Sequence, residues 1–309
     1  MGGVVTAKFD IIGDIHGHAD ALHELLHKLG YRQQQGAFMH AEQRQALFLG
    51  DLIDRGPQQL EVLGTVKKMV DVGAARTVMG NHELNAIGWT FYDAQGQALR
   101  PHTEQNRYQH AAFLDAVGEG SDEHQFWVDW FLPLPIYLQT PHLQLIHACW
   151  SPNDFEIVQP YLTSLGQIKP QQLHTVFNKG SAPFKALETL LKGPEYKLPP
   201  PHYFKDKSGH KRVEARLKWW EDKGTLAEVA FLPPHVAAQL PKIRVDEALA
   251  PYAAVDRPTF VGHYWFSGTP QPLTAQVACL DYSVARGGQL VAYRFDGESE
   301  LDESKFVAV

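Results

Sequence analysis

Cysteine is scarce in this sequence, which has only two in 309 residues, Cys149 and Cys279, and no Cys-x-x-Cys pair. Two distant cysteines cannot build the disulfide framework that small secreted domains use, so the composition fits a reducing compartment. The chain also lacks a basic start followed by an apolar segment, and it has no run of about 18 apolar residues. We therefore expect neither export nor membrane association, and a cytoplasmic protein.

Positive charge is in deficit, with 28 Lys and Arg against 35 Asp and Glu, for a formal net charge of -7. This balance gives no overall electrostatic reason to bind a polyanion, so nucleic acid is an unfavoured partner and a nuclease an unfavoured function. Hydrophobic residues make up 44% of the chain and charged residues 20%, which excludes a disordered or fibrous protein. We expect one domain over residues 1–309, with an insertion or cap over 150–250, where prolines are frequent.

Short apolar runs alternate with helical periodicity over residues 8–82. Leucines at helical spacing predict a helix over 22–29, and a second apolar stripe predicts one over 60–70, with Pro57 in its first turn. The predicted strands are 9–12, 46–49, 76–79, 143–146, 259–261, 276–280 and 289–295. This alternation by itself predicts an α/β fold of the doubly wound type, with polar loops at the carboxyl ends of the strands.

Three predicted strands end in a glycine followed by aspartate or asparagine, in GDIHG (13–17), GDLIDRG (50–56) and GNHE (80–83). Glycine allows the backbone to approach a ligand closely, and oxygen and imidazole donors suit Mn, Fe or Zn. Two later strands end in a histidine. Each motif alone is also compatible with a capped turn or a hydrogen-bonded histidine, but their joint occurrence favours a metal site. The candidate ligands are Asp14, His16, Asp51, Asn81, His147 and His263.

Six ligands favour two ions, and two ions about 3.5–4 Å apart need a bridging ligand, for which Asp51 is the best candidate. We assign Asp14, His16 and Asp51 to the first metal, and Asp51, Asn81, His147 and His263 to the second. Two cations sharing a water lower its pKa toward neutrality and neutralise phosphate oxygens. The motifs therefore predict hydrolysis of phosphate esters by a metal-bridging hydroxide.

Three further residues of these motifs are predicted to be catalytic. His82 follows the ligand Asn81 but faces elsewhere, which suits a general acid that protonates the leaving oxygen. Asp54 would orient its ring, and Arg55 would bind phosphate oxygens through its planar guanidinium group.

The motifs resemble the calcineurin-type metallophosphoesterase superfamily and, within it, the phosphoprotein phosphatase branch, which also contains symmetrical diadenosine tetraphosphate hydrolases and related bacterial phosphatases. The resemblance is specific over residues 8–90, moderate around His147 and over 259–295, and absent over most of the insertion. It implies a central β-sandwich flanked by helices, with an inserted, mostly helical or irregular cap, in place of a doubly wound sheet. It also implies the two-metal assignment, with Mn first and Fe or Zn as alternatives.

Some positions depart from the family pattern or are matched only loosely. Trp265 stands where many members have the second histidine of a Gly-His-x-His motif, as the phosphoprotein phosphatase branch tolerates. The family implies a second phosphate-binding arginine, for which Arg212 and Arg216 are candidates, although a solvated charged face is the alternative for both. Tyr282 is a candidate for the family tyrosine that approaches the metals, and Cys149 is expected to pack in the core.

The leading hypothesis is a metal-dependent phosphatase acting on phosphomonoesters, phosphoserine or phosphothreonine proteins included. The alternative is a bis(5'-nucleosyl)-tetraphosphatase that hydrolyses dinucleoside polyphosphates and needs room for two nucleosides. The expected partner is thus a phosphorylated small molecule, a nucleotide or a phosphoprotein. A binding module without catalysis is disfavoured, because all of the predicted ligands and catalytic residues are present.

Overall fold

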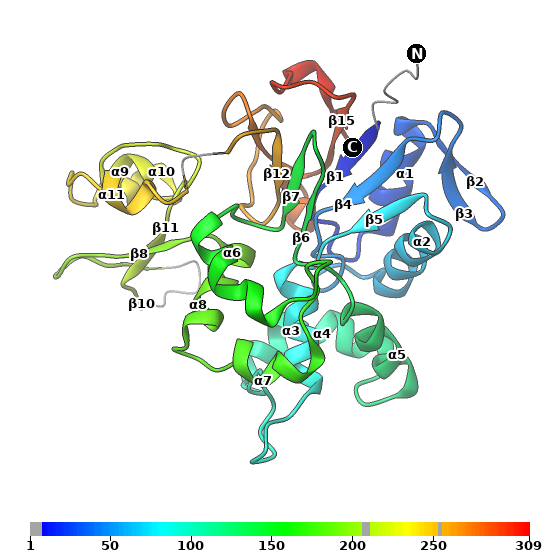
Figure 1. The fold of residues 1–309 in the computed structure, drawn as a ribbon, viewed down its shortest axis with the longest axis horizontal. Helices are drawn as coiled ribbons and strands as arrows, with labels where there is room; N and C mark the ends of the chain where they lie inside the picture. The colour runs from blue at the N-terminus through cyan, green and yellow to red at the C-terminus, as the bar shows by residue number, and fades with distance from the viewer. Residues whose placement is uncertain (1–7, 206–210, 253–254) are drawn as a thin grey trace.

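The computed structural model describes residues 8–205, 211–252 and 255–309, and two β-sheets lie at its centre (Figure 1). The first sheet contains, in spatial order, β14 (Asp281–Tyr282), β15 (Gln289–Phe295), β1 (Phe9–Ile12), β4 (Gln45–Phe48) and β5 (Ala75–Thr77), and β16 (Phe306–Ala308) also pairs with β15. The second contains β13 (Val277–Cys279), β12 (Thr259–Val261), β7 (Gln144–Ile146) and β6 (Tyr137–Gln139). Strands β1, β4 and β5 run parallel, as do β7, β12 and β13, so the carboxyl ends of each set lie at one edge of its sheet.

One hydrophobic cluster joins the two sheets. Ile11 of β1 and Leu47 of β4 belong to it together with Leu145 of β7 and Phe260 of β12, and all four side chains are buried. The neighbouring residue Ile12 belongs instead to the larger cluster that includes the helices. Because successive side chains of a strand point to opposite faces, the first sheet has apolar residues on both faces and is covered on both sides.

Two helices pack against the first sheet on the face away from the second. Helix α1 (Ala19–Leu29) buries Leu22, Leu25, Leu26 and Leu29, as its leucine spacing predicts, and ends at Gly30 in the left-handed conformation, with φ 96°. Helix α2 (Gln59–Asp71) starts two residues after Pro57, so the proline precedes the helix rather than occupying its first turn. A hairpin of β2 (Tyr31–Gln34) and β3 (Ala37–His40) follows α1.

Helices α3 (Asn81–Thr90), α4 (Glu104–Val117) and α5 (Asp122–Phe131) follow β5 and lie together at the bottom of Figure 1. The chain after β7 adds α6 (Pro152–Val158), α7 (Leu173–Val176) and α8 (Ala182–Lys192), and α8 packs against α6 and α7. Apolar residues of α6 and α8, such as Val158 and Leu190, belong to the same large cluster as α1 and α2. This part of the 150–250 segment is therefore continuous with the main core.

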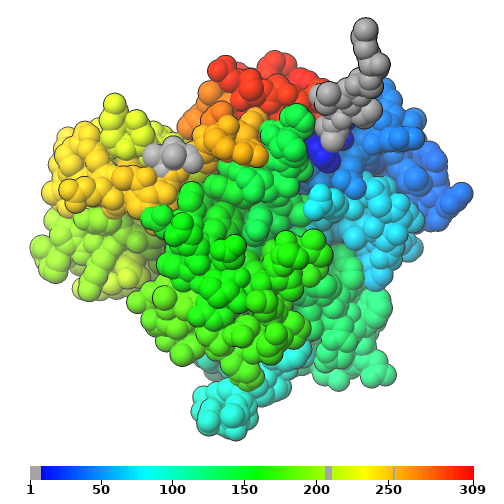
Figure 2. Space-filling model, viewed as in Figure 1, coloured from blue at the N-terminus to red at the C-terminus, as the bar shows by residue number. Residues whose placement is uncertain are grey.

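The rest of that segment has a small core of its own, which includes Leu217, Leu226 and Leu249. It forms the projecting lobe on the left of Figure 2. Its elements are β8 (Glu195–Lys197), β9 (Phe204–Lys205), β10 (Lys211–Arg212), β11 (Glu214–Arg216), α9 (Leu226–Val229), α10 (Pro234–Ala237) and α11 (Asp246–Leu249). A single domain with an insertion over 150–250 stays a prediction.

The fold class predicted from the resemblance is confirmed: the chain is a mixed α/β protein built on two stacked sheets and flanked by helices. The doubly wound arrangement that the alternating pattern alone predicts is wrong. The prediction fails because strands β7, β12 and β13, which come late in the chain, form a second sheet instead of extending the first. Within the described ranges, we find no helix that is both long enough and apolar enough to cross a membrane.

Candidate metal centre

The six predicted ligands come from the ends of five strands, and the structure brings their side chains together. Asp14 and His16 follow β1, Asp51 follows β4, Asn81 begins α3 after β5, His147 follows β7 and His263 follows β12. The Oδ2 atom of Asp51 lies 3.3 Å from Nε2 of His147 and 3.6 Å from Nε2 of His16. The backbone N–H of His263 donates to Oδ2 of Asp14 at 3.0 Å. Asp51 therefore lies at the centre of the cluster, where a bridging ligand would have to be.

Two of the histidines are held with one ring nitrogen available as a ligand. Nδ1 of His147 lies 2.7 Å from the carbonyl oxygen of Leu49, and Nδ1 of His16 lies 2.9 Å from that of Ile53. A carbonyl oxygen only accepts, so Nδ1 of each ring carries a proton, and Nε2 is the ring nitrogen directed at Asp51. This second hydrogen bond is the arrangement that orients histidine ligands in metal sites.

Several buried polar atoms of the cluster have no hydrogen-bond partner among the residues that the structure describes. They are Oδ1 of Asp14, Nε2 of His16 and Nε2 of His263, and all three side chains are buried. Unpartnered buried acceptors are costly, and each requires a physical explanation. Divalent cations would satisfy these lone pairs, and carboxylate and imidazole donors suit Mn, Fe or Zn. The residues present therefore fit a pair of divalent metal ions.

Burial shifts the protonation equilibria of the cluster. It lowers the pKa of His16 to about 3, and it lowers the pKa of His263 well below the ordinary value, with a further contribution from Arg216. Burial alone would raise the pKa of Asp51, but the neighbouring His147 and His82 hold it well below its usual range. Neutral imidazoles and an ionised central carboxylate are the forms that bind metal ions.

Two further groups respond to the negative charge of the cluster. Burial raises the pKa of Asp14 well above its ordinary value, and Asp281 raises it further. Burial alone would lower the pKa of His147, but Asp51 and Asp14 raise it to about 10. The rise at His147 and the smaller contribution of Asp281 at Asp14 reflect buried negative charge, which a bound cation would compensate. A proton on His147 and a metal ion thus compete for the same lone pair.

The backbone is strained where the loops carry these side chains. Six non-glycine residues of these loops have a positive φ, between 47° and 71°. They are His16, Asp51, Asp54, Arg55, His263 and Trp265. Such residues cost of order 1–3 kcal/mol each and persist where the surrounding structure fixes them. The loops are also packed too closely for a side chain, since a Cβ on Gly262 would lie 1.9 Å from Oδ1 of Asp14. Strain concentrated in this way is typical of functional sites.

Glu83 was not singled out by the sequence reasoning, yet it connects two of the motif loops. Its fully buried carboxylate accepts hydrogen bonds from the backbone N–H groups of Gly80 at 2.9 Å, Asp51 at 2.9 Å and Leu52 at 2.8 Å. Part of this role is visible in the sequence, because Glu83 lies three residues after the helix N-cap Gly80, as in a capping box. The bonds to the second loop are not visible there.

His82 lies beside the cluster with its ring fixed by a carboxylate. Its Nδ1 lies 2.5 Å from Oδ2 of Asp54, and its Nε2 lies 3.8 Å from Oδ2 of Asp51. Sequence reasoning missed a second partner of Asp54, the buried His110, whose Nδ1 lies 2.8 Å from Oδ1. Burial alone would raise the pKa of Asp54, but His110 and His82 lower it below its ordinary value. An ionised Asp54 accepts the Nδ1 proton of His82, so Nε2 is the atom that faces the metal cluster.

The predicted substrate-binding residues have different positions. The guanidinium of Arg55 lies over the ring of Trp265, 4.2 Å from its centroid, and Trp265 neighbours His16. The positive charge of Arg216 contributes to the lowered pKa of His263. Arg212 is exposed in strand β10 of the projecting lobe. Tyr282 is buried between the sheets, and its hydroxyl accepts a hydrogen bond from the backbone N–H of Gln271 at 3.1 Å.

The role of each of these four residues in substrate binding stays a prediction. The expectation that Cys149 packs in the core agrees with its complete burial in the large hydrophobic cluster.

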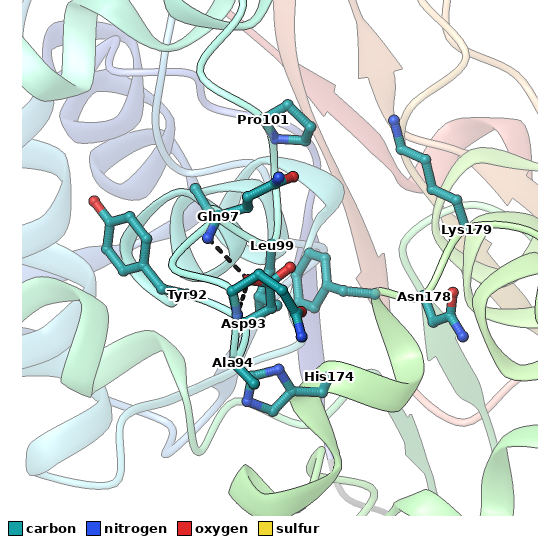
Figure 3. Close-up of a pocket in the computed structure, with 12 residues that line it drawn as sticks. Tyr92, Asp93, Ala94, Gln97, Leu99, Pro101, His174, Asn178 and Lys179 are labelled. Carbon is teal, nitrogen blue, oxygen red and sulfur yellow. Dashed lines mark hydrogen bonds between the residues drawn. The ribbon is translucent and has the colours of Figure 1, made fainter.

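A separate cavity of about 770 Å³ lies beyond the end of α3 (Figure 3). Tyr92, Asp93 and Gln97 line one side, and His174 and Lys179 line another. The Asp93 carboxylate accepts hydrogen bonds from the backbone N–H groups of Gln95 and Gln97 at 2.9 and 2.8 Å, so it closes its own turn. Among the residues that the structure describes, the lining contains none of the predicted metal ligands.

Comparison with known proteins decides the family. The model of the calcineurin-like phosphoesterases matches residues 7–263, which is most of the chain. The chain belongs to this family. The resemblance inferred from the motifs is therefore confirmed, together with the class of enzyme, a hydrolase of phosphoester bonds. Membership also implies divalent metal ions, in agreement with the two overlapping groups of His16, Asp51 and His82 and of Asp51, His147 and His263.

Two curated relatives are named asymmetrical bis(5'-nucleosyl)-tetraphosphatase PrpE. The protein of Oceanobacillus iheyensis is 32% identical over 141 residues, which cover 46% of this chain and 55% of the relative. The protein of Halalkalibacterium halodurans is 51% identical over 75 residues, which cover 24% of this chain and 30% of the relative. The matches thus span about half or less of these relatives.

Among solved structures, a protein serine/threonine phosphatase from Saccharomyces cerevisiae aligns with a TM-score of 0.51. The alignment covers all of this chain and 80% of that chain, at 14% sequence identity. At this identity the likeness concerns the fold alone.

Proposed function

We propose that this protein is a phosphoester hydrolase that uses two divalent metal ions, with manganese as the first candidate. The observation that carries the proposal is the convergence of Asp14, His16 and His263, each with an unpartnered buried acceptor atom, around the central carboxylate of Asp51. Asp14, His16 and Asp51 would hold one ion, and Asp51, Asn81, His147 and His263 the other. When bound, the ions would supply an activated water and neutralise phosphate oxygens.

The chain's own groups account for the remaining requirements of the reaction. Arg55 lies over Trp265, whose ring neighbours that of the ligand His16, and from there it would bind a phosphate oxygen beside the ligands. His82 would give its Nε2 proton to the leaving oxygen as the bond from phosphorus to that oxygen breaks. Asp54 would keep the ring in place and stabilise its protonated form, because its carboxylate lies 2.5 Å from Nδ1.

Two substrate classes are compatible with this site. The first is a phosphomonoester, and this class includes phosphoproteins. It is compatible because a single phosphate group could contact the metal site, Arg55 and His82 together. The second is a dinucleoside polyphosphate, which the names of the two curated relatives favour. Both share the same chemistry at phosphorus and differ only in what lies beyond the scissile bond.

The test is hydrolysis of an aryl phosphate, a phosphopeptide and diadenosine tetraphosphate by the metal-free protein, before and after addition of manganese. We expect turnover of at least one substrate only after manganese is added. Full activity in excess chelator would contradict the two-metal proposal. Cleavage of the dinucleotide with no action on a phosphopeptide would select the second substrate class.

A further inference from the structure

Two arginine side chains lie over one tryptophan ring next to the predicted metal ligands. Cζ of Arg286 is 3.5 Å from the centroid of the Trp265 ring, and Cζ of Arg55 is 4.2 Å from it. The ring centroids of Trp265 and His16 are 6.2 Å apart. We call Arg55, Trp265 and Arg286 the arginine–tryptophan cluster. It gives the site a second guanidinium group from a residue other than the candidates Arg212 and Arg216.

In the part of the chain that the structure describes, the two guanidinium groups have no anionic partner. Over the described ranges, the side chains of Arg55 and Arg286 form neither a hydrogen bond nor an ion pair, and both residues are exposed. Like charges that share one ring repel each other, so the arrangement favours an anion that binds both. Arginine suits this role because its planar fork binds phosphate oxygens in pairs and also stacks on aromatic rings.

Asp281, another buried residue that sequence reasoning missed, fixes the relative position of Trp265 and Arg286. Its carboxylate accepts hydrogen bonds from the backbone N–H of Trp265 at 2.8 Å and from that of Ser283 at 2.9 Å. Ser283 begins the short turn that ends at Arg286, and the N–H of Arg286 donates to the carbonyl of Ser283 at 2.8 Å. Both Trp265 and Ser283 have a positive φ, of 49° and 63°. The cluster is therefore built into the loops and does not depend on a flexible side chain alone.

A cleft of about 750 Å³ adjoins the cluster, and none of the predicted metal ligands is among the described residues that line it. Trp265, Tyr282 and Arg286 line it together with the backbone of Gly287 and Gly288. Its volume lies within the range of small-molecule sites, and it combines an aromatic ring with a cationic group. These features suit the part of a substrate that extends beyond the phosphate group being hydrolysed.

We propose that Trp265 and Arg286 determine specificity for a nucleoside polyphosphate. Arg286 would bind phosphate groups beyond the scissile one, and the attached nucleoside would occupy the cleft. The inference rests on the proposed hydrolase function and narrows its substrate class. A phosphomonoester has one phosphate group, which the metal ligands and Arg55 would engage, and it would leave Arg286 without a partner. A polyphosphate carries a negative charge on each successive phosphorus and can reach both arginines.

The experiment compares kcat/KM for diadenosine tetraphosphate and for 4-nitrophenyl phosphate, in manganese, for the wild type and for Arg286→Ala. We expect the ratio of the two values to fall about 10- to 100-fold in the variant, because a charged hydrogen-bonding group is lost for one substrate only. Arg286→Lys, which keeps the charge but not the fork, should give an intermediate ratio. Arg32→Ala removes an exposed arginine of the β2–β3 hairpin and should leave the ratio unchanged.

A second measurement, inhibition by tripolyphosphate, distinguishes a specific loss of polyphosphate binding from misfolding of a variant. Inorganic tripolyphosphate should inhibit hydrolysis of the aryl phosphate by the wild type, and its inhibition constant should rise about 10-fold or more in Trp265→Leu and Arg286→Ala. An unchanged ratio and an unchanged inhibition constant would overturn the inference. A wild type that hydrolyses the aryl phosphate but not the dinucleotide would also overturn it and leave the hydrolase proposal standing. A wild type that hydrolyses neither would instead contradict the proposed function.

Discussion

The carboxylate of Glu83 accepts a hydrogen bond from the backbone N–H of Asp51 at 2.9 Å. Glu83 belongs to the GNHE motif and Asp51 to the GDLIDRG motif, so this bond joins two loops that follow different strands. The backbone N–H of His82 in turn donates to Oδ1 of Asp51, also at 2.9 Å. The position of the central carboxylate is thus held from both sides by residues of one motif.

We predict that Glu83→Gln weakens both folding and metal binding. The glutamate accepts from three backbone N–H groups, whereas a glutamine has one carbonyl oxygen and an NH₂ group that would face a donor. A buried donor left unsatisfied costs about 1–3 kcal/mol, which urea unfolding would detect. Misplacement of Asp51 should weaken manganese binding about 10- to 100-fold, measured by calorimetric titration. Glu24→Gln on the exposed face of α1 is the control. Equal affinity and stability in both variants would contradict the role of Glu83.

The proposed acid predicts a dependence on the leaving group. His82→Ala should lower kcat about 10²–10⁴-fold for phenyl phosphate, whose leaving oxygen needs a proton. The loss should be much smaller for 4-nitrophenyl phosphate, whose leaving group departs readily without one. Asp54→Asn should also lower kcat more for phenyl phosphate than for 4-nitrophenyl phosphate, because it removes the carboxylate that holds the His82 ring. Stopped assays with both esters would measure the difference, with the exposed His235→Ala as the control. Equal losses for both esters would argue against His82 as the acid.

Metal removal should change stability as well as activity. Because a ligand that binds only the folded state stabilises it, manganese at about 100 times its Kd should add roughly 2.7 kcal/mol to the free energy of unfolding. Chelation should lower Tm, and added manganese should restore it. Asp51→Asn should bind fewer than the two equivalents expected for the wild type and lose most of this Tm response. Asp71→Asn, at an exposed ion pair with Lys67, should behave as the wild type. Equal metal content in all three proteins, measured by mass spectrometry, would exclude Asp51 as a bridging ligand.

A pH effect on stability is expected at the ion pairs of Asp296, far from the predicted ligands in sequence. Burial alone would raise its pKa, but Lys305 and Arg44 lower it to about 2. Because the folded-state pKa lies below the unfolded value, the group stabilises the fold at neutral pH and this contribution is lost as pH falls from about 4 to about 2. Asp296→Asn should therefore be less stable than the wild type above pH 5, and the difference should shrink below pH 4. The carboxylate is partly exposed, so the difference should be small and weaker in high salt. Urea unfolding at several pH values would measure it, and a difference that grows toward low pH would contradict the sign.

Much of the fold could be predicted because it depends on local pattern. Strands β12 and β15 coincide with the predicted runs 259–261 and 289–295, and α1 ends at the expected glycine. The candidate ligands could be selected because each follows a strand directly, and strand ends are where loops converge. Periodicity could not predict the stacking of two sheets, because it records only neighbours in sequence. Strand β1 pairs with β15, which lies near the other end of the chain. Only the resemblance to a family supplied the stacking.

By itself, the sequence determined which residues follow each strand, and therefore which oxygen and imidazole donors are available. The tertiary structure decided how those donors are held: it placed Glu83 under Asp51, His110 against Asp54, and Asp281 between the loops of Trp265 and Ser283. It also placed Arg286 over Trp265. The physical reason is that strand and helix patterns record burial along one segment, whereas a buried carboxylate finds its hydrogen-bond donors across segments that meet only when the two sheets pack.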